Sequence, residues 1–247
     1  MMKLKLILPV ADTPATRKAN EGIPLALRTL NPETEVSVSF LKKGFEALNT
    51  ITRIGYNSPG IAEAAVTAEK EGADGIFINC FADPAVDMAR ELVHVPVFGG
   101  FRSAMMAALG CGKRFAVMIP GKEDPAGTFL LNKVIENNPE FKDSIVRRDF
   151  TDLDVLELHD KEKLLERLAG FAEESACRYD CDCLILGCTA MSYIIDDLRA
   201  GLCRRGCRIT VLEPLSTGLK MLESFVTLGL NNSTAHLVNN EMDQLIK

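Results

Sequence analysis

The sequence predicts an α/β protein made of two pseudosymmetric lobes, each a roughly four-stranded parallel sheet flanked by helices. Short apolar segments alternate with longer amphipathic ones, which is the pattern of βα units. Two strand-to-helix corners also recur at nearly one spacing. Asp74–Cys80 resembles Asp182–Cys188 at an offset of 108 residues, and Ile7–Pro9 resembles Met118–Pro120 at an offset of 111. We therefore expect two lobes related by a pseudo-two-fold axis, with an active site in the cleft between them.

The first lobe is expected to contain four strands and three helices. Its strands are predicted at residues 3–9, 36–41, 75–79 and 95–98, and its helices at residues 14–30, 58–72 and 83–93. Two of these helix starts are placed at Pro59 and Pro84, because proline is favoured in the first helical turn. The alternation of apolar and small polar residues from Val36 to Leu41 is typical of a strand.

The second lobe repeats this order. Its strands are predicted at residues 115–119, 145–148, 183–187 and 208–212, and its helices at residues 101–109, 125–138, 161–179 and 192–202. Two further helices are predicted at 214–228 and 233–246. Because strand 208–212 completes the second sheet, we expect these helices to return to the first lobe. The predicted boundaries are 1–99 plus 213–247 for the first lobe and 100–212 for the second.

The composition narrows the class of protein. The chain has 247 residues, is 47% apolar and carries a net charge of −6, which argues against a nucleic-acid or anionic-membrane partner. No apolar stretch approaches the ~20 residues that span a bilayer, and the N-terminus lacks the pattern of a signal peptide. We expect a cytoplasmic protein whose eight cysteines are free thiols.

Cys80 and Cys188 are the main functional signal. Each follows a short apolar strand where a helix is expected to begin, and ligands of parallel sheets bind at the carboxyl ends of strands. The helix dipole would lower the pKa of a thiol there. Two thiols that face one cleft suit a two-base reaction, in which a thiolate removes a proton from carbon and the other thiol protonates the opposite face. Either cysteine alone is more simply a buried core residue, but their matched placement favours the functional interpretation.

The other cysteines give weaker signals. The spacings of Cys177, Cys181 and Cys183, and of Cys203 and Cys207, do not match common zinc sites, and no histidine lies near them. The sequence also lacks a GxGxxG fingerprint, a P-loop and a lysine marked as a pyridoxal phosphate site. We therefore expect no metal and no cofactor. The expected partners are a small-molecule substrate and further copies of the chain in a homo-oligomer.

A set of motifs spread over nearly the whole chain matches the pattern of one family. The motifs are Asn79–Pro84 (NCFADP), Ala89–Leu92 (AREL), Pro96–Gly99, Gly112–Val117 and Leu186–Met191 (LGCTAM), with a similar tail at 213–230. In these residues the chain resembles the aspartate/glutamate racemase superfamily, and within it the hydantoin and allantoin racemases. The two cysteine motifs together are fairly specific.

This resemblance implies a cofactor-independent racemase of two pseudosymmetric α/β domains, acting on a hydantoin-like or amino-acid-derived substrate. The family's catalytic pair corresponds to Cys80 and Cys188. The backbone amides that follow each cysteine would hold the carbonyl or carboxylate oxygens and stabilise an enolate as its charge develops. The residues predicted to bind substrate are Phe81, Ala82, Thr189, Ala190, Val10, Gly44, Pro120 and Gly121.

Three departures from the family pattern fall around the expected substrate. The first strand ends in Leu8–Ala11 (LPVA), where the family usually has Asn-Pro-Asn-Thr and the second asparagine binds substrate. The matching turn of the second lobe is Ile119–Gly121 (IPG), where threonines are usual. Phe101 and Arg102 stand where many hydantoin racemases have an acidic residue. The sequence therefore specifies the reaction class better than the substrate.

Two other functions are compatible with the same residues. One is cis–trans isomerisation of a maleate-like diacid, in which one cysteine adds covalently to the double bond and Arg102 supports a carboxylate. The other is a two-lobed ligand-binding or redox-sensing protein without turnover, whose two thiols would approach closely enough to form a disulfide.

Overall fold

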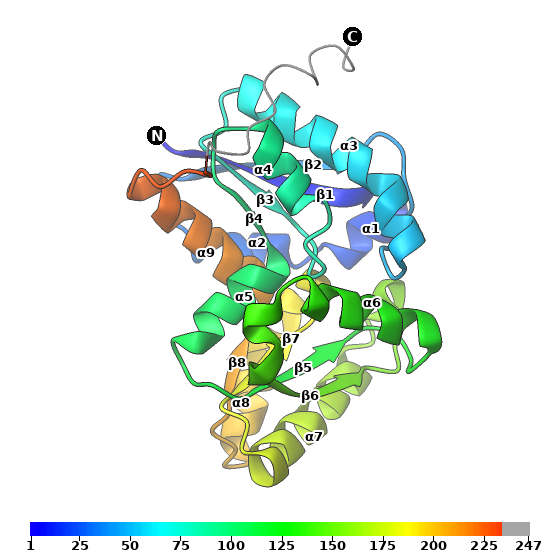
Figure 1. Ribbon diagram of the computed structural model, residues 1–247. Helices are drawn as coiled ribbons and strands as arrows, with labels where there is room; N and C mark the ends of the chain where they lie inside the picture. The colour runs from blue at the N-terminus through cyan, green and yellow to red at the C-terminus, as the bar shows by residue number, and fades with distance from the viewer. Residues whose placement is uncertain (234–247) are drawn as a thin grey trace.

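The computed structural model describes residues 1–233 and contains two separate four-stranded, all-parallel sheets (Figure 1). The strands of the first sheet are β1 (Lys3–Ala11), β2 (Glu35–Leu41), β3 (Gly75–Ile78) and β4 (Val97–Gly99). Those of the second are β5 (Phe115–Ile119), β6 (Ile145–Phe150), β7 (Cys183–Leu186) and β8 (Thr210–Leu212). The strand orders are β2-β1-β3-β4 and β6-β5-β7-β8, so both sheets share one topology. The two parallel sheets predicted from the repeated spacing are confirmed.

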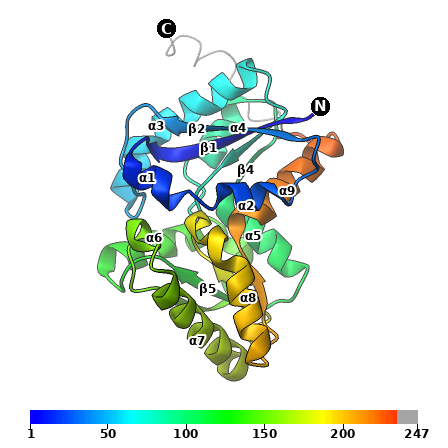
Figure 2. The same ribbon diagram turned by 180° about the vertical axis from the view of Figure 1, so that it is seen from behind.

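Helices cover both faces of the first sheet (Figure 1, Figure 2). They are α1 (Pro14–Ala19), α2 (Ile23–Leu27), α3 (Ile51–Lys70), α4 (Val86–Leu92) and α9 (Pro214–Thr227). Leu4, Leu6 and Leu8 of β1 pack with α2 and α9, whereas Ile7 packs on the opposite face with α3 and α4, because successive side chains of a strand point to opposite faces. Helix α9 follows the last strand of the second sheet, so the chain crosses back to the first sheet there.

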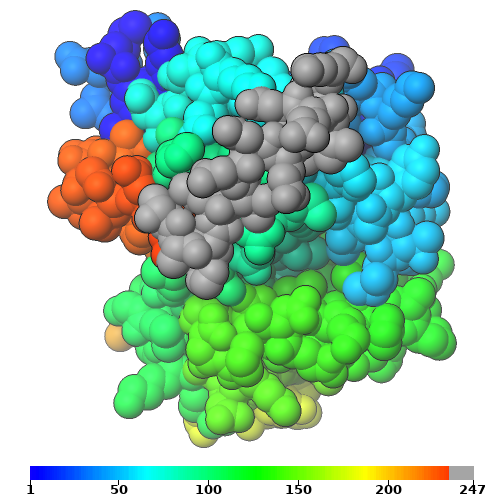
Figure 3. Space-filling model, turned by 45° about the horizontal axis from the view of Figure 1, so that its top comes forward, coloured from blue at the N-terminus to red at the C-terminus, as the bar shows by residue number. Residues whose placement is uncertain are grey.

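The second sheet is covered in the same way. Its helices are α5 (Gly100–Leu109), α6 (Pro125–Glu136), α7 (Lys161–Tyr179) and α8 (Ile195–Arg204), with the short 3-10 helices η1 (Pro139–Ser144), η2 (Val155–Glu157) and η3 (Thr189–Ile194). Helices α5 and α6 pack on the face that carries Phe115 and Val117, and α7 and α8 pack on the face that carries Ala116 and Met118. Figure 3 shows the loop before α3 lying next to α6, in blue and green, at one edge of the junction between the lobes.

Helix α3 begins earlier than the predicted start at Pro59. Its first residue is Ile51, where Thr50 Oγ1 accepts a hydrogen bond from the Arg53 amide at 3.3 Å. Pro59 therefore lies inside the helix, where its ring crowds the carbonyl four residues earlier. That carbonyl belongs to Gly55, a small residue with open surroundings. The capping threonine, and not the proline, marks the start of this helix.

The predicted helix 14–30 is divided into α1 and α2. Asn20 ends α1 and donates through its side chain to the Thr16 carbonyl at 2.8 Å. A Cβ atom on Gly22 would lie 2.8 Å from Ser192 Oγ, so the chain after the break lies directly against η3. The predicted helix 192–202 likewise starts earlier, as η3 from Thr189, and continues as α8. Of the predicted helix 233–246, residues 234–246 lie outside the part of the chain that the structure describes. No helix within residues 1–233 is both long enough and apolar enough to cross a membrane.

Candidate active site

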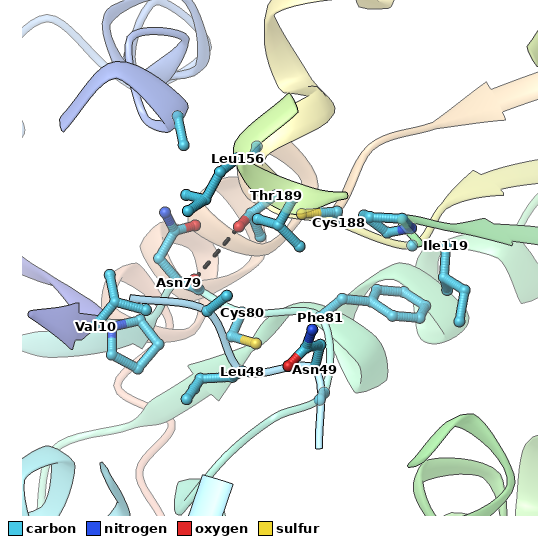
Figure 4. Close-up of a pocket in the computed structure, with 18 of the residues that line it drawn as sticks. Val10, Leu48, Asn49, Asn79, Cys80, Phe81, Ile119, Leu156, Cys188 and Thr189 are labelled. Atoms are coloured by element: carbon cyan, nitrogen blue, oxygen red, sulfur yellow. Dashed lines mark hydrogen bonds between the residues drawn. The ribbon is translucent and has the colours of Figure 1, made fainter. Parts of the chain in front are cut away.

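Cys80 and Cys188 line one cavity whose wall is built from both lobes. Cys80 comes just after β3 and Cys188 just after β7, and these strands hold the same place in their sheets. The cavity measures about 140 Å³, whereas a single water needs ~10–15 Å³ on the same kind of measure. It therefore has room for a small organic molecule. Figure 4 shows the two thiols with side chains of both lobes around them.

Glycines let neighbouring backbone approach both cysteines. The Gly100 amide donates to the Cys80 carbonyl at 3.1 Å, and a Cβ atom on Gly100 would lie 2.9 Å from that oxygen. Gly187 donates to the Met118 carbonyl at 2.7 Å, and a Cβ atom there would lie 2.3 Å from the Ile119 side chain. Both distances are too short for a side chain, so only glycine permits these contacts.

Asp83 links the Cys80 loop to helix α5. Its carboxylate accepts hydrogen bonds from the Phe101 and Arg102 amides, at 2.8 and 2.9 Å, and thereby caps the first turn of α5. Its backbone is left-handed, with a φ of 49°. Burial raises the pKa of the Asp83 carboxyl to about 6, although the two amides act in the opposite direction. A charge on this carboxylate raises the pKa of the Cys80 thiol.

Burial governs the protonation of the two thiols. It raises the pKa of Cys80 to about 12 and that of Cys188 to about 11, and the backbone amides that follow each cysteine oppose it only in part. The lowered pKa expected from helix dipoles is therefore not found. Cys80 is followed by a turn, because α4 begins only at Val86, and Cys188 precedes only the short helix η3. Both thiols remain partly exposed to the cavity.

The two thiols also influence each other. A negative charge on Cys188 raises the pKa of Cys80, so the loss of one proton disfavours the loss of the second. Because both pKa values are raised, both thiols are mostly protonated near neutral pH, and the pair loses one proton well before the second. One base and one acid in the same cavity is the protonation state that a proton transfer through both thiols requires.

The structure brings most of the predicted substrate-binding residues into the cavity wall. Those that line it are Phe81, Ala82, Thr189, Ala190, Val10 and Pro120. Gly44 and Gly121 do not. Gly44 packs closely against the Asn57 side chain, and the Gly121 amide donates to the Leu153 carbonyl at 2.7 Å. These two glycines therefore shape loops behind the wall.

The sequence did not identify the polar residues that stand around the thiols. Asn20, Asn49, Asn79 and Glu46 all line the cavity, and Figure 4 shows Asn49 and Asn79 near Cys80. Asn79 belongs to the motif quoted for the family, yet its side chain had no assigned role. Asn20 and Asn49 lie at a helix break and in a loop, where asparagine is common for local reasons. Only the folded chain distinguishes these residues from ordinary turn residues.

Asn57 holds the loop of residues 42–50 against the end of β1. Its Nδ2 donates to the Pro9 carbonyl at 2.8 Å and to the Phe45 carbonyl at 3.2 Å, while its Oδ1 accepts from the Phe45 amide at 2.9 Å. The side chain is buried, and it makes three of its four possible hydrogen bonds to these two segments. Both segments contribute to the cavity wall, so Asn57 fixes their relative position.

The cavity wall is mostly apolar and has no cationic side chain among its described residues. Among its described lining residues none is lysine, arginine or histidine, and Glu46 is the only acidic one. Arg102, which was expected to support a diacid, lies outside this wall and donates to Asn138 Oδ1 at 3.0 Å, with Asp87 and Glu140 nearby. The apolar lining residues include Leu8, Leu48, Leu130, Leu131, Val134, Val155 and Leu156. The wall therefore suits an uncharged ligand better than a dianion.

The remaining cysteines do not form a recognisable metal centre. Within residues 1–233, no three side chains of histidine, cysteine, aspartate or glutamate are grouped as metal ligands. Cys177 and Cys203 are exposed, whereas Cys181 and Cys183 are buried, and all eight thiols are free.

Comparison with known proteins finds relatives that match most of the chain. Residues 12–222 match a family model described as Asp/Glu/Hydantoin racemase. The chain is 25% identical to a hydantoin racemase of Pseudomonas sp. (strain NS671) over 233 residues, which are 94% of this chain and 89% of that protein. It is 26% identical to a hydantoin racemase of Rhizobium meliloti over 233 residues, with 94% and 92% covered.

Solved structures share the fold. Allantoin racemase from Klebsiella pneumoniae has a TM-score of 0.83 at 23% identity, covering 98% of this chain and 95% of that one. Allantoin racemase from Pseudomonas fluorescens has a TM-score of 0.82 at 18% identity, covering 97% and 98%. An arylmalonate decarboxylase has a TM-score of 0.61 at 15% identity, covering 96% and 98%. At these identities the likeness concerns the fold alone, and the fold is common to proteins of more than one named activity.

Proposed function

The chain belongs to the Asp/Glu/hydantoin racemase family, and we propose that it inverts the configuration of a carbon acidified by a neighbouring carbonyl, with Cys80 and Cys188 as its acid/base pair. The racemase-type isomerase expected from the sequence is confirmed by this membership, whereas the two-cysteine mechanism is the proposal. The observation that supports it most is the occurrence of two thiols at equivalent strand ends in one cavity.

In the proposed reaction one cysteine acts as base and the other as acid. The thiolate removes the proton from the acidified carbon, and the electron pair of the broken C–H bond passes into the carbonyl group to give an enolate. The thiol on the opposite side then transfers its proton to the other face of that carbon. The configuration is inverted, the two sulfurs exchange roles, and no redox partner is needed.

Backbone amides beside the cysteines are the donors that we assign to the developing charge. Phe81 and Thr189 line the cavity directly after the two cysteines. Amide donors aimed at a developing oxyanion lower the barrier to its formation, so these two are assigned to the enolate oxygen. The amides of Ala82 and Ala190 favour the thiolate of the preceding cysteine and are assigned to the base.

The character of the wall supports an uncharged substrate. A 5-substituted hydantoin has a neutral ring, a C5 proton beside a carbonyl and an apolar substituent for the leucine-rich part of the cavity. The names of the curated relatives support the same class. A maleate-like diacid fits less well, because its two carboxylates would enter a wall that has Glu46 and no cation among the described lining residues.

The experiment that tests this function is the racemisation of single enantiomers of 5-benzylhydantoin in D2O, with EDTA present and no added pyridoxal phosphate. We expect optical rotation to decay while the C5 proton exchanges for deuterium, as followed by polarimetry and NMR. The double variant Cys80→Ser/Cys188→Ser is the matched control for spontaneous exchange. A wild-type rate no higher than that of the control, for hydantoins, amino acids and small diacids alike, would contradict the proposal.

A further inference from the structure

Asn79, the residue before Cys80, has one polar atom without a partner among the described residues. The residue is 5% exposed and lines the cavity. Its Nδ2 donates to Asn20 Oδ1 at 3.1 Å, and its backbone carbonyl accepts from Thr189 Oγ1 at 3.3 Å (Figure 4). Its Oδ1 is a buried acceptor with no hydrogen-bond partner among the described residues.

A chain of hydrogen bonds determines which atom of Asn79 is left over. Asn20 Nδ2 donates to the Thr16 carbonyl at 2.8 Å, and a carbonyl can only accept. Asn20 Oδ1 must therefore face Asn79, where it accepts a hydrogen bond from Asn79 Nδ2. Turning the Asn79 amide over would set two oxygens against each other. The free atom beside the cavity is thus an acceptor and not a donor.

A buried acceptor without a partner destabilises the folded protein, and such atoms are rare in native structures. In the wall of a cavity, a donor on a bound ligand removes this penalty. A carboxylate has no hydrogen to donate to Asn79 Oδ1. It would also be repelled by Glu46, and the described lining residues include no cation to balance its charge. A neutral ligand with an N–H group meets both conditions.

We propose that Asn79 Oδ1 accepts a hydrogen bond from an N–H group of the substrate and thereby selects ureides and amides over carboxylic acids. The inference rests on the proposed racemase function and adds a specificity-determining atom to it. Because Asn79 directly precedes Cys80, this bond orients the substrate beside one of the two thiols. Asn20 is the positioning residue, since it holds the Asn79 amide in its orientation.

The substrate reaches this oxygen only when side chains of the cavity wall move. Asn79 Oδ1 exposes less than 1 Å². Leu156, labelled in Figure 4, lines the same cavity and is only half-buried. Rotation of an aliphatic side chain is fast compared with ligand binding and turnover, so movement of such lining residues gives a ligand access to the acceptor.

The test is a thermodynamic cycle that combines substitution of Asn79 with methylation of the ligand. Isothermal titration calorimetry measures the binding affinities. The ligands are 5-benzylhydantoin and its N1-methyl and N3-methyl analogues. In the wild type, methylation of the N–H that contacts Asn79 should weaken binding about tenfold, the cost of one lost hydrogen bond. In Asn79→Ala the same methylation should weaken it less than about twofold, because the acceptor is already gone.

Two controls accompany this cycle. Asn49→Ala removes a different asparagine from the same wall and should keep the full methylation penalty. Asn20→Ala should reduce the penalty in part, because Asn79 loses the partner that orients its amide. Circular dichroism verifies that each variant is folded, and Asn79→Ser replaces the alanine variant if that protein does not fold.

Racemic ligands are used, so no net reaction accompanies binding and the two proposals fail separately. Equal methylation penalties in the wild type and in Asn79→Ala, for both analogues, would overturn the inference even if the wild type racemises hydantoins. Failure of all three compounds to bind would also overturn it. A penalty that disappears in Asn79→Ala, in a protein that does not racemise the ligand, supports the N–H acceptor and contradicts the proposed racemase function.

Discussion

The Cys80 and Cys188 loops hold matching places in the two sheets but differ in local structure. After Cys80 the chain makes a turn with left-handed residues at Asp83 and Ala85, and the buried Asp83 carboxylate acts to raise the Cys80 pKa. After Cys188 the helix η3 begins at once, and two backbone amides favour the Cys188 thiolate. The same topology therefore carries two different electrostatic environments.

This difference makes a pseudosymmetric pair chemically unequal. A charge on Asp83 acts against the Cys80 thiolate, whereas two backbone amides favour the Cys188 thiolate, so we expect Cys188 to lose its proton before Cys80 does. In the proposed mechanism Cys188 is then the base of the free enzyme and Cys80 the acid. Racemisation in one direction starts from this state, whereas the other direction starts only after the proton has moved between the sulfurs. A repeated fold thus does not imply two equivalent bases.

Replacing each cysteine should give the largest effect, and it tests whether both thiols take part in the reaction. Cys80→Ser and Cys188→Ser should each lose ~10²–10⁴ of the racemisation rate, because a serine hydroxyl is a far weaker base than a thiolate. Polarimetry on both hydantoin enantiomers measures the loss. The exposed Cys111, which is not a cavity residue, provides the matched control Cys111→Ser. A near wild-type rate in either active-site variant means that the cysteine concerned is structural.

The pH dependence of the rate tests the raised pKa values. The active base is the thiolate, so its population grows as pH rises towards the folded-state pKa of Cys188, about 11. Between pH 7 and pH 9, kcat/KM should therefore rise about tenfold per pH unit. Stopped-flow polarimetry in a series of buffers measures this slope. A rate that is already flat in this range indicates a thiol with a lowered pKa.

Asp83→Asn tests whether the charge of Asp83 makes the Cys80 loop differ from the Cys188 loop. Removing the charge should lower the pKa of Cys80, so Cys80 should react with iodoacetamide at lower pH in a Cys188→Ser background. The free energy of unfolding should also fall by about 1–3 kcal/mol, because asparagine offers one acceptor to the Phe101 and Arg102 amides where aspartate offers two. Peptide mass spectrometry and urea denaturation measure the two effects.

Asp182→Asn is the control for that variant. Asp182 also accepts two backbone amides, from Lys113 and Arg114, but it stands at the opposite end of β7 from Cys188. It should lose stability without changing the reactivity of either active-site thiol. A shift of equal size in both aspartate variants would show that the effect is one of stability and not of local charge.

The glycines beside the two cysteines should give the smallest effects. Gly100→Ala and Gly187→Ala each force a Cβ atom into backbone or side-chain atoms and should lower the free energy of unfolding by about 1–3 kcal/mol. Gly170→Ala, in α7 with nothing near the added atom, should instead raise it by up to about 1 kcal/mol. Urea denaturation measures all three. An unchanged stability in Gly100→Ala or Gly187→Ala means that the corresponding loop has room to move.

Much of the fold could be predicted because its signals are local and are repeated. The corners around Cys80 and Cys188 recur at one spacing, and this repetition correctly indicated two separate parallel sheets. The family resemblance, which rested on the motifs around the same cysteines, is confirmed by the match over residues 12–222. Helix starts were predicted less well. Pro59 predicts a start although Thr50 is the cap, because proline is a stronger signal in the sequence than a single threonine.

The properties of the site depend on long-range contacts that the sequence does not display. The sign of the thiol pKa shifts was predicted wrongly, because it depends on how completely distant segments close around Cys80 and Cys188. In the sequence Asn57 is an ordinary polar residue just before the predicted helix 58–72, and only the folded chain brings β1 and the loop 42–50 to its side chain. The unpaired oxygen of Asn79 can likewise be identified only in the folded chain, where Asn20 lies beside it.

The most direct test of two unequal bases is deuterium exchange, measured separately for each enantiomer in Cys80→Ser and Cys188→Ser. Each variant keeps one thiol and should therefore exchange the C5 proton of a single enantiomer with D2O without inverting it. The two variants should act on opposite enantiomers, and Cys80→Ser, which retains the more acidic Cys188, should exchange faster at neutral pH. Exchange of both enantiomers at equal rates by either variant would contradict this account.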